Sequence, residues 1–87
     1  MKHASGENLS LIVPLLDQLR TLPELKEKKT GVFYRKSRAF LHFHEDDGKL
    51  YADVRLSGLD FTRYPSTTKR EQHTLFTTIA QGLKKGS

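Results

Sequence analysis

Two histidines and an aspartate stand at spacings that could hold a metal ion. In an extended strand, His42 and His44 project from the same side, about 7 Å apart along the chain. A two-residue turn at Asp47-Gly48 would place Asp53 opposite His42 on the next strand. Two imidazoles and a carboxylate can bind zinc or another first-row divalent metal and leave coordination positions open. The alternative is a plain cross-strand contact between His42 and Asp53.

The same three side chains could also transfer protons, because imidazole titrates near neutral pH. The sequence contains no nucleophile motif, no glycine-rich phosphate loop and no residues that specify an oxyanion hole. A chain of 87 residues is also short for a deep pocket. A non-enzymatic binding protein is therefore favoured over an enzyme, and a divalent metal is the only cofactor that the residues suggest.

The residues around these side chains alternate with a period of two, which is typical of β-strands. Strands are expected at 30–35, 38–45 and 49–56. Lys36-Ser37 and Asp47-Gly48 separate them and can form tight turns. Because both links are hairpins, the expected sheet is a three-stranded antiparallel meander.

The segments on either side of the strands have the apolar spacing of amphipathic helices. The first helix is expected to begin near Ser10, which can cap it, and to end before Pro23. The second is expected after 65–67, where Thr68 and Glu71 fit a capping box. The apolar positions are Leu9, Ile12, Val13, Leu16, Leu19, Leu75, Phe76, Ile79, Ala80 and Leu83. The predicted fold class is α+β, a two-layer sandwich of order α-β-β-β-α with both helices on one face of the sheet.

The hairpin register sorts the strand residues onto two faces. The face expected to contact the helices is apolar and carries Val32, Tyr34, Ala39, Leu41, Phe43, Leu50, Ala52, Val54 and Leu56. The face expected to stay open, and to bind, carries Phe33, Arg35, Phe40, His42, His44, Tyr51, Asp53 and Arg55. A slip of one residue would bury the histidines and the aspartate, so the hydrophobic pattern opposes it.

An open sheet face with three aromatic rings and two arginines has three candidate uses. Large aromatic patches are rarely left in water, so the first expectation is a homodimer or a protein partner. The second is single-stranded nucleic acid, since rings stack on bases, arginines contact phosphates and the formal net charge is +5. The third is binding of a metal or small ligand by the His-x-His pair.

Composition limits the domain organisation and the compartment. The length suits one small domain, expected at 9–84, with a flexible lead-in at 1–8 and a flexible end at 85–87. The sequence has no cysteine, which excludes disulfides and thiolate zinc sites and fits the cytoplasm. No apolar run reaches the length of a membrane span, and the first residues lack the apolar core of a signal peptide. We therefore expect a cytoplasmic protein that does not associate with membranes.

The strand region also resembles the small bacterial domains of the luciferase family. The resemblance covers 38–56 and is carried by a His-Phe-His-x-Asp stretch at 42–46 and by Asp-Val-Arg-Leu at 53–56. The helix before the strands matches by pattern only. The resemblance implies an α+β fold and points to His42, His44 and Asp53, but it implies no particular reaction. Residues 47–52 make the hairpin longer than in that family.

Overall fold

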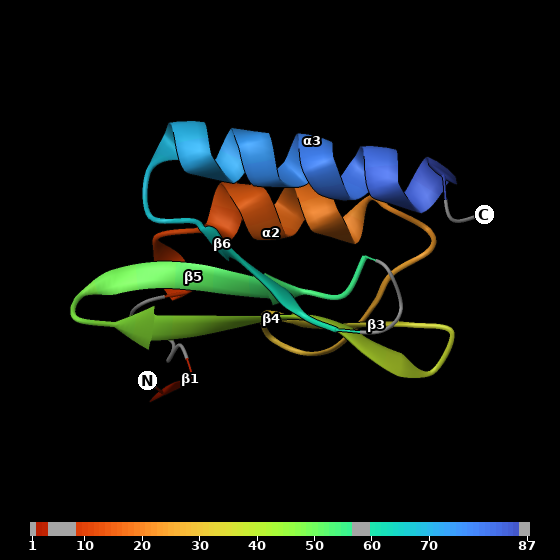
Figure 1. Ribbon diagram of the computed structural model, residues 1–87, viewed down its shortest axis with the longest axis horizontal. Helices are drawn as coiled ribbons and strands as arrows, with labels where there is room; N and C mark the ends of the chain where they lie inside the picture. The colour runs from red at the N-terminus through yellow and green to blue at the C-terminus, as the bar shows by residue number, and fades with distance from the viewer. Residues whose placement is uncertain (1, 4–8, 57–59, 86–87) are drawn as a thin grey trace.

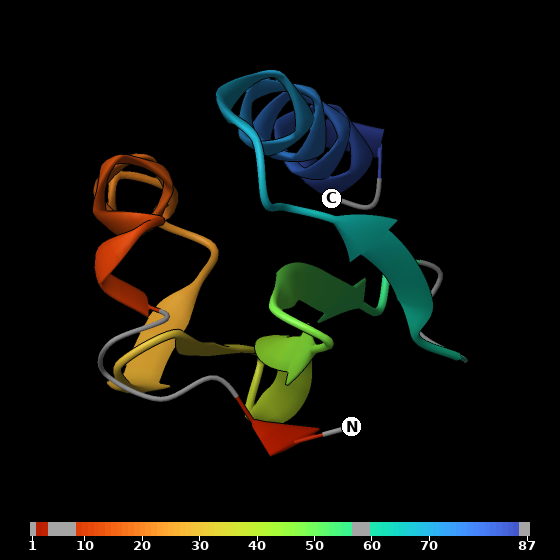
Figure 2. The same ribbon diagram turned by 90° about the vertical axis from the view of Figure 1, so that its left-hand side faces the viewer.

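The chain folds into an antiparallel sheet with two helices on the same side of it (Figure 1). The computed structural model describes residues 2–3, 9–56 and 60–85. The elements in chain order are β1 Lys2–His3, α2 Val13–Arg20, β2 Lys26–Lys29, β3 Val32–Arg35, β4 Arg38–Asp46, β5 Lys49–Val54, β6 Thr62–Pro65 and α3 Lys69–Lys85. The lead-in predicted at 1–8 and the end predicted at 85–87 lie outside the described residues, apart from β1 and the last residue of α3. Figure 2 shows both helices above one face of the sheet.

The sheet is larger than the predicted meander. Its strand order is β2-β3-β4-β5-β6, and β1 pairs with β4 beside this path. The three predicted strands correspond to β3, β4 and β5. The strands β2 and β6 extend the sheet at its two edges, where the sequence has no long run of alternating apolar residues. The α+β class, the antiparallel sheet and the two helices are confirmed, whereas three strands were too few.

Both predicted hairpin turns are confirmed. The φ angles are 52° and 69° at Lys36 and Ser37, and 53° and 77° at Asp47 and Gly48. Two consecutive positive φ angles define the type I′ turn, whose twist matches that of the strands it joins. The turn at Asp47-Gly48 sets the predicted register, in which His42 pairs with Asp53.

A bulge in β4 changes the faces predicted for β3. Phe33 lies opposite Leu41 rather than opposite Phe40, so β4 has one extra residue at this point. The extra residue reverses the alternation of β3 relative to β4. Phe33 is therefore 1% exposed and belongs to the core, while Val32 and Tyr34 are half-buried. The prediction that placed Val32 and Tyr34 in the core and Phe33 on the open face was wrong.

The helix α2 begins later than predicted. Its N-cap is Ile12, and no side chain caps the helix, so Ser10 does not serve as the cap. The helix ends at Arg20, ahead of Pro23, as predicted. The buried side of α2 carries Leu15, Leu16 and Leu19. Val13 lies off this side and is 43% exposed, so the prediction of its burial was wrong.

The helix α3 begins with the predicted capping box. The Thr68 backbone N–H donates to Glu71 Oε1 at 3.0 Å, and the Glu71 N–H donates to Thr68 Oγ1 at 3.1 Å. The hydroxyl of Thr67 accepts a hydrogen bond from the Leu50 N–H at 2.9 Å and donates to the Leu50 carbonyl at 3.2 Å. The start of α3 is thereby fastened to β5.

The core lies between the sheet and the two helices. Its buried apolar residues are Leu9, Ile12, Leu15, Leu16, Leu19, Phe33, Phe40, Leu41, Phe43, Leu50, Ala52, Val54, Leu75, Ile79 and Leu83. Burial of this apolar surface is the main source of stability for the small fold. Neither helix in the described part of the chain has the length and apolarity that a membrane span requires.

Glu27 joins the edge strand β2 to α2. Arg20 donates to its carboxylate through Nε at 2.6 Å and Nη2 at 3.0 Å, and the Gly31 N–H donates to Oε2 at 2.9 Å. The hydrogen bonds from Arg20 hold the pKa of Glu27 below its ordinary value, although partial burial acts in the opposite direction. The carboxylate form is therefore stabilised in the folded state.

Replacing Gly48 with Ala should lower the free energy of unfolding by about 1 kcal/mol, because an L-residue is strained at positive φ. The cost should come from the backbone alone, since no heavy atom outside Gly48 and its two chain neighbours lies within 4 Å of the position of an added Cβ. Urea denaturation measures the change. Asp47→Gly, at the neighbouring positive φ, is the control and should shift stability by less than about 0.5 kcal/mol. An unchanged stability for Gly48→Ala would contradict the turn.

Glu27→Gln should lower the free energy of unfolding by roughly 1 kcal/mol at pH 7. Because the folded-state pKa of Glu27 is lowered, its contribution is present above the ordinary pKa of about 4.3 and is lost as the pH falls below it. The difference between the two proteins should therefore shrink between pH 6 and pH 3 in urea titrations. Glu24→Gln, at an exposed position nearby, is the matched control. A difference independent of pH would refute the assignment.

Candidate functional site

A cluster of polar side chains lies on the face of the sheet away from the helices. It contains His42 and His44 from β4, Asp53 from β5 and Arg63 from β6; these four residues are called the Asp53 cluster below. The strand register pairs His42 with Asp53, and Asp53 with Arg63. Residues opposite each other in register share a face of the sheet, so three adjacent strands bring these side chains together.

Asp53 is at the centre of this cluster and is 8% exposed. Arg63 donates Nε–H to Oδ1 at 2.8 Å and Nη2–H to Oδ2 at 3.1 Å. His44 Nε2, on the diagonal neighbour of Asp53 in the register, lies 2.9 Å from Oδ2. Both oxygens of the buried carboxylate are thus held in defined directions.

The charges around Asp53 favour its ionised form. The hydrogen bonds from Arg63 are the main reason why the pKa of Asp53 lies below its ordinary value. Burial acts in the opposite direction, while the charges of Arg63, His44 and His42 add to the lowering. Asp53 is therefore a carboxylate near neutral pH, which is the form that can ligate a cation.

Ring contacts connect the two histidines of the cluster to Phe61 and to Arg55, which follows β5. The rings of His42 and His44 have centroids 4.5 Å apart and an interplanar angle of 81°. The ring of Phe61 lies 4.9 Å from that of His42, and Arg55 Cζ lies 4.4 Å from the Phe61 centroid. Phe61 is 38% exposed. Contacts therefore run without a break from Arg55 through Phe61 and the two imidazoles to Asp53.

The donor atoms of this face are close enough to share one metal ion. One ligand atom from each of His42, His44 and Asp53 can be chosen so that all lie within 4.8 Å of one another. The two histidines are half-buried, and their strands fix the backbone on which they stand. The predicted grouping of these three side chains is thus found in the structure.

The structure does not keep the eight predicted face residues together. Arg55, His42, His44 and Asp53 lie together, and Tyr51 is half-buried opposite His44 in the register. Arg35 is half-buried near the end of β3. Phe33 and Phe40 are core residues at 1% and 2% exposure, so their predicted place on the open face was wrong. The bulge in β4 is the physical reason, because it moves both rings into the apolar cluster.

Neither Phe61 nor Arg63 is among the eight face residues predicted from the sequence, which predicts no strand between 56 and the second helix. Residues 62–65 nevertheless form β6 and pair with β5. The signal that could have identified this strand is its Thr-Arg-Tyr-Pro sequence, in which a β-branched and an aromatic residue are two positions apart. The strand is short, and its proline stands at the end.

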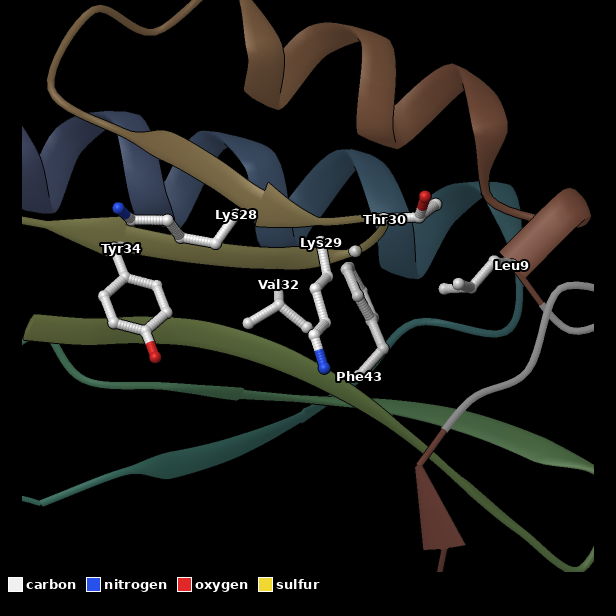
Figure 3. A pocket seen from close by; sticks show the side chains of 8 residues that line it. Leu9, Lys28, Lys29, Thr30, Val32, Tyr34 and Phe43 are labelled. Atoms are coloured by element: carbon white, nitrogen blue, oxygen red, sulfur yellow. The ribbon is translucent and has the colours of Figure 1, made fainter.

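A pocket of about 440 Å³ lies next to the β2–β3 turn. Figure 3 shows the side chains that line it. They are Leu9, Lys28, Lys29, Thr30, Val32, Tyr34 and Phe43, together with Gly31 in the turn. The ammonium group of Lys28 is 5.9 Å from the ring centroid of Tyr34. None of the eight predicted face residues lines this pocket, so it is separate from the Asp53 cluster.

No family model, curated protein or solved structure matches this chain. The resemblance of 38–56 to the luciferase family therefore stays a prediction.

Replacing Arg63 with Gln should raise the pKa of Asp53 toward its ordinary value, because the change removes the paired hydrogen bonds of the guanidinium group and its positive charge, both of which lower that pKa. Titration of the Asp53 carboxyl carbon by NMR measures this pKa directly. Arg70→Gln is the matched control, since Arg70 is exposed on α3, across the sheet from the cluster. If the pKa of Asp53 is the same in both variants, the ion pair with Arg63 does not exist in solution.

Proposed function

We propose that this protein is a non-enzymatic binding module whose open sheet face binds a divalent transition metal, with zinc as the preferred ion. The ligands are His42, His44 and Asp53. The observation that carries the proposal is the approach of their donor atoms to within 4.8 Å of one another on two paired strands. The site needs only side chains whose backbone positions are already fixed by the register.

The donor set favours zinc over the alkaline-earth ions. Imidazole nitrogen and carboxylate oxygen are common zinc ligands, whereas calcium and magnesium prefer oxygen donors alone. Three protein ligands leave at least one coordination position for water or another ligand. The face is thus suited to bind a metal that itself remains open to a further group.

Two of the three ligands, His44 and Asp53, are already close to the separation that one zinc ion requires. His44 Nε2 and Asp53 Oδ2 are 2.9 Å apart. Two ligands of one tetrahedral zinc ion lie about 3.3 Å apart, given bond lengths of about 2.0–2.1 Å. A movement of a few tenths of an ångström would therefore let both atoms ligate the same ion.

Arg63 supports this arrangement as the outer partner of the carboxylate. Its Nε–H and Nη2–H hold Asp53 Oδ1 and Oδ2, and Oδ2 also faces His44 Nε2. Partners of this kind orient metal ligands and are commonly worth a factor of ten or more in metal affinity. Because Oδ2 is the oxygen that His44 Nε2 approaches, it is the one expected to ligate the metal together with that imidazole.

The other uses expected for this face stay predictions. A protein partner, a second copy of the chain and single-stranded nucleic acid all depended on a broad aromatic surface. The burial of Phe33 and Phe40 reduces that surface, and Tyr51 and Phe61 remain partly accessible. The metal proposal does not depend on the area of the aromatic surface.

Zinc should bind the wild-type chain with one-to-one stoichiometry in isothermal titration calorimetry, and His42→Ala should weaken binding at least tenfold because one of three ligands is lost. NMR spectra should also show that zinc no longer shifts the His44 imidazole resonances in this variant. His73→Ala is the matched control, since His73 is exposed on α3.

Far-UV circular dichroism checks that each variant is folded, and His42→Asn provides a polar replacement if the alanine variant is not. Wild-type zinc affinity in a folded His42 variant, or no zinc binding by the wild type, would exclude the site.

A further inference from the structure

Two arginines, Arg55 and Arg63, are in contact with residues around the proposed metal position. Arg63 contacts Asp53 directly, and Arg55 lies over Phe61, whose ring contacts His42. We propose that the metal site takes a phosphate-type oxyanion as its additional ligand and that Arg55 and Arg63 help to hold it. This inference rests on the metal-binding function proposed above.

The charge of the occupied site favours an anion. A divalent ion exceeds the single negative charge of Asp53, and the histidines would ligate it as neutral imidazoles. The guanidinium groups of Arg55 and Arg63 add further positive charge on the same face. A site with this excess of positive charge attracts an anion to the open coordination position of the metal.

Arg55 has a donor that such an anion would satisfy. Its Nε is buried and makes no hydrogen bond within the described residues. Buried N–H groups of this kind are normally paired, because an unmade hydrogen bond costs free energy. The guanidinium plane rests on the Phe61 ring at 4.4 Å, which limits the directions in which it can point. Arg55 is thus held in place with an unused donor.

The geometry of the donors favours a phosphate over a carboxylate. Arginine presents several N–H groups in a planar fork, and phosphate offers three oxygens that can meet both a metal and a guanidinium group. The ring of Phe61, 38% exposed, lies beside this position and can contact an apolar group on the ligand. A phosphate monoester with an aromatic or other apolar substituent fits these features.

The test uses phenyl phosphate and the full chain loaded with cobalt, whose visible spectrum reports changes of its ligands. Calorimetry should show that phenyl phosphate binds the cobalt-loaded protein at least tenfold more tightly than the metal-free protein, with a change in the cobalt spectrum. Arg55→Gln should weaken phenyl phosphate binding at least tenfold and leave the cobalt affinity within twofold. Arg38→Gln, at an exposed position in the β3–β4 hairpin, should behave as the wild type.

The outcomes separate this inference from the metal proposal. Failure of cobalt and zinc to bind would overturn the proposed function itself. Metal binding with no preference of phenyl phosphate for the loaded protein, or with no effect of Arg55→Gln, would overturn the anion site. Benzoate, which has the same ring and a carboxylate, should bind more weakly, and equal binding would overturn the phosphate preference. Arg55→Lys serves if the glutamine variant does not fold, and it should also lose affinity because lysine lacks the planar fork.

Discussion

The register between β4 and β5 is the constraint on which the rest of the structure depends. It directs Leu41 and Phe43 toward the helices and places His42 opposite Asp53 on the other face. A slip of one residue would exchange the two faces, since side chains alternate along a strand. The slipped form would bury imidazole and carboxylate groups without water and expose the apolar residues of the core, so it is strongly disfavoured. The type I′ turn at Asp47-Gly48 selects the same register from the backbone side.

The parts of the fold that could be predicted from the sequence are those with local determinants. The turn at Asp47-Gly48 needs residues that tolerate positive φ, and the start of α3 needs a hydroxyl and a carboxylate three residues apart, as at Thr68 and Glu71. Once the turn is known, counting outward gives the β4–β5 pairs. The grouping of His42 and His44 with Asp53 follows from that count, so three of the four residues of the Asp53 cluster could be predicted from the sequence.

The remaining features depend on contacts between distant segments. A bulge cannot be recognised from the alternation of apolar residues in the sequence. The burial of Phe40 therefore could not be predicted without knowing which residues pack around it. The sequence of β2, Lys-Glu-Lys-Lys, is typical of a solvent-exposed charged segment rather than of a strand. Its half-buried residue, Glu27, is hydrogen-bonded by Arg20 of α2, a contact that the sequence pattern does not predict. Arg63 joins the site only because β6 pairs with β5. A strand of four residues is too short for its residue pattern to predict this pairing.

The charged edge formed by β2 also affects edge-to-edge pairing between copies of this chain. An outer strand offers backbone groups to which a strand of another molecule could add, the route by which sheets grow into fibrils. The side chains of Lys26, Lys28 and Lys29 are exposed along this strand. Two copies approaching edge to edge would bring like charges together, and Coulomb repulsion opposes that encounter. The lysines thus oppose the addition of a second copy of the chain at this edge of the sheet.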